Sequence, residues 1–153
     1  MKVHQAFDII ENHADEGDFI GEIEEEMIVA AETDLKVIFP KSYRFFLKRY
    51  GAGDIFGEEI FGLGLEESGI PSMPWITKKL REEEGLPNSL ICVYSTGYDN
   101  EYYCLDCSNV KDSEGDGAQV VLYVSGLAMD EQSFEVVAKD FGEFLWNTLQ
   151  ESM

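Results

Sequence analysis

Positive charge is scarce in this sequence. Its 153 residues include 11 Lys and Arg side chains against 31 Asp and Glu side chains, which gives a formal net charge of -20. Proteins bind nucleic acids and anionic membranes through clustered Lys and Arg side chains. We therefore expect no nucleic-acid partner and no membrane partner, and a basic protein is the kind of partner that this charge favours.

Cysteines and long apolar runs are scarce as well. The cysteines are odd in number, and Cys104 and Cys107 form a single CxxC motif. Neither the histidines nor Cys92 have the spacing from this motif that a four-ligand zinc site needs, so we predict no metal and buried, reduced thiols on a strand. The N-terminus lacks a signal-peptide core, and no stretch approaches the roughly 18 consecutive apolar residues of a membrane span. These features favour a soluble, cytoplasmic protein.

The residues that catalysis most often uses are also few. His4 and His13 are the only histidines, and the sequence places no nucleophile beside them. Gly51, Gly53 and Gly57 follow a predicted helix, whereas a phosphate-binding loop places its glycines before a helix N-terminus. We therefore predict that the protein is not an enzyme, has no catalytic residues and needs no cofactor.

The remaining composition is that of one folded domain. Hydrophobic residues make up 44% of the chain, enough for a core, and the length suits a single domain over 1–153. Apolar spacing and caps predict helices over 2–12 and 23–38, from Pro40 to Gly51, from Pro74 to Gly85, and after Asp140. Strands are predicted over 58–64, 89–96, 101–108 and 119–125. Strands that follow one another in this way favour an antiparallel meander.

The helix after Pro40 has a clear amphipathic pattern. Its apolar positions follow the spacing of one helical face, and Gly51 suits the left-handed C-terminal cap. The apolar face consists of Tyr43, Phe46, Leu47 and Tyr50, and the opposite side carries Lys41, Arg44 and Lys48. The glycines after it are therefore interpreted as the end of a helix.

Charge is distributed unevenly along the chain. Residues 1–34 contain 11 acidic side chains and a single basic one, whereas residues 36–49 contain five basic side chains and no acidic one. The acidic stretch Gly21–Met27 is either a solvated helix face or an electrostatic docking surface, and the sequence leaves both open.

Two turns resemble binding sites. Residues 112–117 imitate the start of a calcium-binding loop, but Tyr123 stands where the bidentate Glu is required, so a turn between two strands is the better interpretation. Residues 95–103 also join two strands. There Asp99, Asn100 and Glu101 lie beside Tyr98 and Tyr102 at a loop tip, which fits a plain hairpin and a binding loop equally well.

Several motifs, taken in order, resemble the SUKH superfamily, which includes yeast cell-wall-synthesis regulators and many bacterial toxin-immunity proteins. The first is "ETDLKVIFPKSYRFFLKRYGAG", with Glu32, Leu35, Phe39 and Pro40 at characteristic positions. The second is "LPNSLICVYSTGYDNEYYCLD", and the third is "VAKDFGEFLWNTL", which resembles the closing short strand and helix of the family. The resemblance covers about residues 20–150, and the turn at Gly97 departs from the glycine-rich family pattern.

The resemblance implies both a fold and a function. The fold is α+β, a single domain whose mostly antiparallel sheet is packed by N-terminal helices, a middle helix and a C-terminal helix. The function is that of a non-catalytic protein-binding module, an immunity protein (antitoxin) that neutralises a cognate basic bacterial toxin domain, such as a nuclease, by covering its active site with an acidic surface. An intracellular regulatory adaptor that binds another protein is the alternative.

Polar loop segments after regular elements are the predicted partner-binding residues. Loops at the ends of strands and helices commonly carry binding residues, and the family places glycine- and acid-containing loops beside the concave side of its sheet. The predicted residues are Asp54, Glu58, Glu59, Tyr98, Asp99, Asn100 and Glu101.

Overall fold

The computed structural model describes residues 2–65, 71–98 and 100–153, which form an α+β fold with a seven-stranded antiparallel sheet. The strands lie in the sheet in their sequence order, so the predicted meander is confirmed. They are β1 (Gly17–Phe19), β2 (Gly53–Ile55), β3 (Glu58–Ile60), β4 (Leu90–Ser95), β5 (Glu101–Asp106), β6 (Val120–Val124) and β7 (Val136–Ala138).

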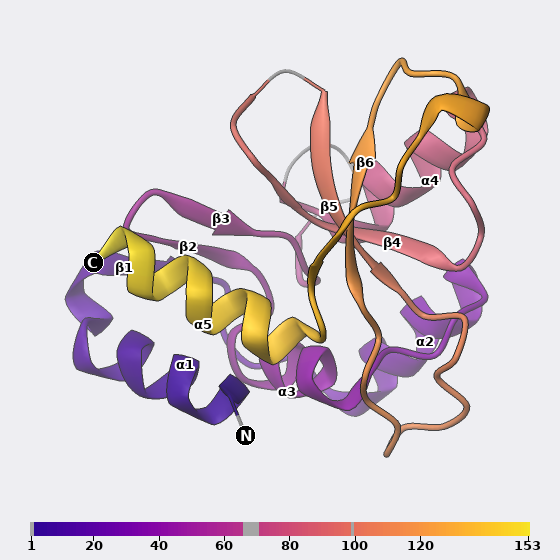
Figure 1. The fold of residues 1–153 in the computed structure, drawn as a ribbon. Helices are drawn as coiled ribbons and strands as arrows, with labels where there is room; N and C mark the ends of the chain where they lie inside the picture. Colours follow the sequence, from indigo (N-terminus) through magenta and orange to yellow (C-terminus); the bar gives the residue numbers. More distant parts are fainter. Residues whose placement is uncertain (1, 66–70, 99) are drawn as a thin grey trace.

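The helices surround this sheet (Figure 1). They are α1 (Lys2–Asn12), α2 (Glu25–Leu35), α3 (Lys41–Tyr50), α4 (Met73–Glu84) and α5 (Phe141–Ser152). Helices α1 and α5 pack against each other, α5 also contacts α3 and β3, and α4 packs on β4. The predicted N-terminal, middle and C-terminal helices are therefore all present.

Helix α3 supplies much of the core. Phe46 and Tyr43 are completely buried, and their rings contact Phe141 of α5. The Tyr43 hydroxyl donates a hydrogen bond to the Phe61 carbonyl at 2.7 Å, so this buried polar group is satisfied. Gly51 has a φ of 73° and its N–H caps the Leu47 carbonyl, which confirms the predicted helix end.

The caps decide where the other helices begin and end. Helix α2 ends before the predicted residue 38, because Lys36 adopts a left-handed conformation with a φ of 59°. Ser72 caps α4, which ends at Gly85 with a φ of 75°. At α5 the Asp140 carboxylate accepts from the Glu143 N–H at 2.8 Å, as predicted, and the Glu143 carboxylate accepts from the Lys139 N–H.

Strands β1 and β2 were not predicted. Each has three residues, too few to show the alternation by which a strand is recognised, and they pair with each other across a long sequence separation. Gly53 permits this pairing, because a Cβ on it would lie 2.2 Å from the Asp18 carbonyl oxygen. The glycine-rich stretch after α3 therefore both ends a helix and begins a strand.

The three cysteines are free and buried, as predicted. Cys92 in β4 and Cys104 in β5 are cross-strand partners with their sulfur atoms 3.3 Å apart, and Cys107 directly follows β5. Residues 112–117 lie in the connection between β5 and β6, where the Lys41 N–H donates to the Gly115 carbonyl at 2.8 Å and Ser42 donates to Asp116 at 2.9 Å. This connection is therefore attached to the start of α3.

Candidate functional site

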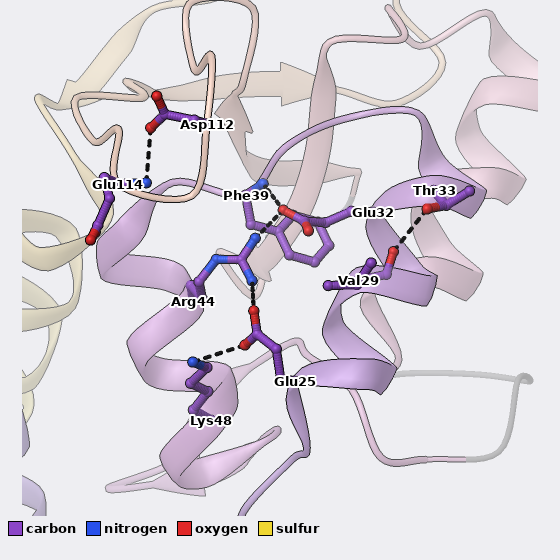
Figure 2. A network of polar contacts seen from close by, with 9 residues as sticks. All are labelled: Glu25, Val29, Glu32, Thr33, Phe39, Arg44, Lys48, Asp112 and Glu114. Carbon is purple, nitrogen blue, oxygen red and sulfur yellow. Dashed lines mark hydrogen bonds and ion pairs between the residues drawn. The ribbon is translucent and has the colours of Figure 1, made fainter.

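The basic segment of the chain forms ion pairs inside the molecule. Arg44 on α3 contacts Glu25 and Glu32 of α2, and Lys48 binds the same Glu25 at 2.8 Å (Figure 2). The pKa of Glu25 is lowered, chiefly by the hydrogen bond from Lys48. Further ion pairs join Lys41 to Glu114 and Arg49 to Glu11. The bases of α3 are thus matched by acids of neighbouring segments and form no open positive surface.

Arg44 lies deeper than its helical position indicates. The pattern places it on the side of α3 opposite the core, but α2 covers that side, and only 5% of Arg44 is exposed. Glu32 accepts hydrogen bonds from both the Arg44 guanidinium and the Phe39 N–H, the latter at 2.7 Å (Figure 2). This network joins α2 to α3.

An unmatched row of acids crosses the other end of the sheet. Asp54 of β2 is paired in register with Asp18 of β1 on one side and with Glu59 of β3 on the other. Within the described residues, none of the three forms an ion pair. Burial raises the pKa of Glu59, and the neighbouring Asp54 raises it further. We call these three residues the acidic row.

The acidic row lies on the sheet face that points away from α5. Successive side chains of a strand point to opposite faces, so Glu58 faces the other way from Glu59. Glu58 accepts hydrogen bonds from the Tyr94 hydroxyl at 2.6 Å and from Ser152 of α5 at 2.5 Å. The predicted residues Asp54 and Glu59 therefore share a face, whereas Glu58 is engaged on the side of the helices.

The predicted loop residues lie at the connection between β4 and β5. Tyr98 is 76% exposed, and Asn100 adopts a left-handed conformation with a φ of 70°. Glu101 begins β5, and its carboxylate accepts a hydrogen bond from the Thr96 hydroxyl at 3.0 Å. Asp99 lies outside the described residues.

The structure brings the two predicted segments together. A hollow of about 250 Å³ is lined by Glu58 and Glu59 of β3 and by Thr96 and Gly97 of the β4–β5 connection. β3 also pairs with the end of β4 through Ile60 and Tyr94. One end of the acidic row therefore borders the exposed loop.

Comparison with known proteins identifies a family and a similar fold. The family model described as SMI1-KNR4 cell-wall, SUKH_5, matches residues 5–150. The chain belongs to the SUKH family. A crystal structure of a protein from Pseudomonas syringae pv. tomato is similar to it with a TM-score of 0.55 and 19% sequence identity, over 75% of this chain and 80% of that one. At this identity the likeness concerns the fold alone.

The thiols of this SUKH chain are unsuited to nucleophilic chemistry. Cys92 and Cys104 are completely buried, and burial raises the pKa of Cys107 to about 12. A thiol of that pKa stays protonated at neutral pH, and the protonated form is a poor nucleophile. His13, which directly follows α1, is hydrogen-bonded through Nδ1 to the Ile9 carbonyl of that helix at 2.9 Å. The exposed groups of the candidate site include carboxylates, the Tyr98 side chain and the Asn100 amide.

Asp18 is the member of the acidic row that sequence reasoning missed. A related signal was present, because "GDF" at 17–19 and "GDI" at 53–55 repeat a Gly-Asp-apolar motif in the two paired strands.

No helix in the described part of this SUKH chain is both long and apolar enough to cross a membrane.

Proposed function

We propose that this SUKH chain is an immunity protein that acts in the cytoplasm, without catalysis, by binding a basic bacterial toxin domain and covering its active site. A nuclease is the toxin class that fits best, because it must present positive charge to its phosphate substrate. The acidic surface would then occupy the same cleft as the nucleic acid.

The acidic row is the observation that carries this proposal. Like charges placed directly opposite on neighbouring strands are destabilising, and the ion pairs of α3 leave these three residues uncompensated in the described structure. Binding surfaces commonly retain groups that the fold alone would not favour. A surface of this kind gains most from a partner that supplies the missing positive charge.

The loop next to the acidic row supplies a second type of contact. Tyr98 has 76% of its surface exposed, and exposed tyrosines are frequent anchors at protein interfaces because they combine apolar area with a hydroxyl group. Asn100 and Glu101 add polar groups beside it. We propose that Asp54, Glu59, Tyr98, Asp99, Asn100 and Glu101 contact the toxin, together with Asp18, and that Glu58 contributes mainly by holding β3 to α5.

The test begins with the partner. The chain is purified from its own host, and the basic protein that accompanies it is identified, produced separately and assayed for nuclease activity with and without the chain. Inhibition at equimolar concentration is the expected result. A partner that has no toxic activity, or whose activity the chain leaves unchanged, would instead favour the alternative of a regulatory adaptor.

Charge-neutral variants then examine the surface. Asp18→Asn, Asp54→Asn and Glu59→Gln together should slow association with the toxin by about tenfold at low salt, because surface charges steer encounter. The control is Asp130→Asn with Glu131→Gln and Glu135→Gln, which removes the same number of charges from three exposed acids in the connection between β6 and β7. Equal effects of the two sets would mean that only the overall charge matters and that the acidic row is not the contact surface.

A further inference from the structure

Large apolar side chains are exposed around the start of α2. Ile20, Met27 and Val29 have 46%, 49% and 46% of their surface exposed, although apolar side chains of this size are usually buried. Within α2 only Ile28 and Leu35 are buried, so the helix uses a narrow stripe to contact the core. Its outer side therefore presents apolar groups to solvent.

A groove lies beside this exposed side. It has a volume of about 630 Å³, and α2 contributes Met27, Ala30 and Ala31 to its lining. Leu63 and Leu65 line it from the segment after β3, and Pro74 lines it from the first turn of α4. The small alanine side chains leave room in which larger apolar side chains of a partner can be inserted.

Ile20 extends the apolar lining at one end. Gly64 lines the groove, and a Cβ on it would lie 2.7 Å from the Cγ2 atom of Ile20, so the Ile20 side chain covers this glycine. Ile20 therefore adjoins the groove that Met27 lines. Apolar centres of this kind are typical of surfaces that bind a helix through several spaced side chains.

The charges in and beside the groove favour a basic occupant. Asp34 and Lys78 line the groove and form an ion pair with each other, so they leave no net charge there. Glu26 lies one helical turn before the lining residue Ala30, and Glu22 and Glu24 precede α2. These three acids are exposed, and none of them forms an ion pair within the described residues. A second copy of this chain would bring the same acids and a net charge of -20, so the two copies would repel each other. An anionic membrane would be repelled in the same way. An amphipathic basic segment suits both the apolar lining and the unpaired acids beside it.

We propose that the groove between α2 and α4 binds an amphipathic, Lys- or Arg-rich helical segment of a partner protein. The apolar side chains of the segment contact Met27 and the alanines, and its basic side chains face Glu22, Glu24 and Glu26. This site shares no residue with the acidic row. Helix α2 and strands β1–β3 lie at different ends of the molecule (Figure 1), and Ile20, which directly follows β1, lies on the side of the groove toward that row. The proposal for the groove holds whether or not the partner at the acidic row is a toxin.

The probe is a synthetic amphipathic peptide with a leucine face and a lysine face. It is titrated into the labelled protein while backbone chemical shifts are recorded, and a peptide with glutamate in place of lysine serves as its charge control. We expect saturable shifts that centre on Met27, Ala30 and Ala31, and no binding of the glutamate peptide. Shifts confined to Asp18, Asp54 and Glu59 would overturn the proposal, as would the absence of saturable binding.

Matched variants test the apolar contact. Met27→Gln should weaken binding by about tenfold, the loss expected of a buried interface anchor. Met129→Gln is the control, since Met129 is also exposed but lies in the connection between β6 and β7. Glutamine and methionine have similar helix propensities, so α2 should remain folded. Equal effects of the two substitutions would refute the groove as the site.

Charge variants separate this site from the acidic row. Glu24→Gln with Glu26→Gln should weaken binding and reduce its salt dependence, whereas Asp54→Asn with Glu59→Gln should leave peptide affinity unchanged. Sedimentation of the protein alone tests whether a second copy of the chain occupies the groove. A dimer that Met27→Gln dissociates would show that a second copy fills the groove and would contradict the proposal.

Discussion

Replacement of Arg44 by methionine removes the central cation of the α2–α3 network (Figure 2). The Arg44 side chain is 7% exposed and that of Glu32 is 12% exposed, so the variant leaves a largely buried carboxylate without its counterion. Breaking a buried ion pair on one side costs about 3–5 kcal/mol. We expect about 3 kcal/mol, the lower end of this range, because Glu32 keeps the Phe39 N–H and the Nε atom of Arg44 has no partner among the described residues.

Lys48→Met is the matched control. Lys48 pairs with Glu25, the other acid of the network, but its side chain is 46% exposed. Exposed ion pairs contribute little, so this variant should lose only about 0.5 kcal/mol. Both substitutions remove one positive charge from α3 and put methionine in its place, so the difference between them measures burial and not charge.

The assay is equilibrium unfolding in urea at neutral pH. Arg44→Met should lower the midpoint without changing the slope, and adding Glu32→Gln should restore about 1–3 kcal/mol, because the uncompensated charge is then gone. If Arg44→Met and Lys48→Met reduced the free energy of unfolding equally, the reasoning that burial makes the Arg44 pair decisive would be refuted.

Three further substitutions test the core, the acidic row and one pH dependence. Phe46→Ala should lower the free energy of unfolding by about 3–5 kcal/mol, since Phe46 is completely buried, and an unchanged urea midpoint would contradict its place in the core. Asp54→Asn should raise that free energy by up to about 1 kcal/mol at neutral pH, because it removes repulsion from both neighbouring strands, and a loss would show that the carboxylate is structural. Burial alone raises the pKa of Glu84, but hydrogen bonds from Ser125, Tyr123 and Gly126 outweigh it, so the folded-state pKa lies below the usual value. The ionised Glu84 carboxylate therefore stabilises the fold above its unfolded-state pKa, and this stabilisation disappears as the pH falls through its folded-state pKa. Glu84→Gln should thus reduce the loss in the free energy of unfolding that is measured between neutral and acidic pH.

Local signals explain why much of the fold could be predicted. Apolar spacing marked the buried faces of α1 and α3, and caps such as Gly51, Gly85 and Asp140 marked helix ends, because a helix is specified by residues within a few positions of one another. The longer strands β4, β5 and β6 were also recognisable, since each contains enough β-branched and aromatic residues to identify it. The motifs of the SUKH family connected these elements in the correct order.

The candidate site depended more on contacts between distant residues. The sequence identified Asp54, Glu59 and the turn near Tyr98 as polar loop segments, and it determined the large negative charge. It could not show that Glu58 is hydrogen-bonded to Ser152 of α5, or that Glu59 borders the β4–β5 connection. Alternation within a strand tells which residues share a face, but not which face a helix will cover.

By itself, then, the sequence determined the net charge, the main helices and strands and the family, all of which follow from composition and from short-range patterns. Only the tertiary structure decided which charges are neutralised. Arg44 is paired with Glu25 and Glu32 because α2 folds over α3, and Asp18 joins Asp54 because two three-residue strands pair across more than thirty intervening positions. The physical reason is that electrostatic energies depend on distance and burial in space, and neither quantity is encoded in the local order of residues.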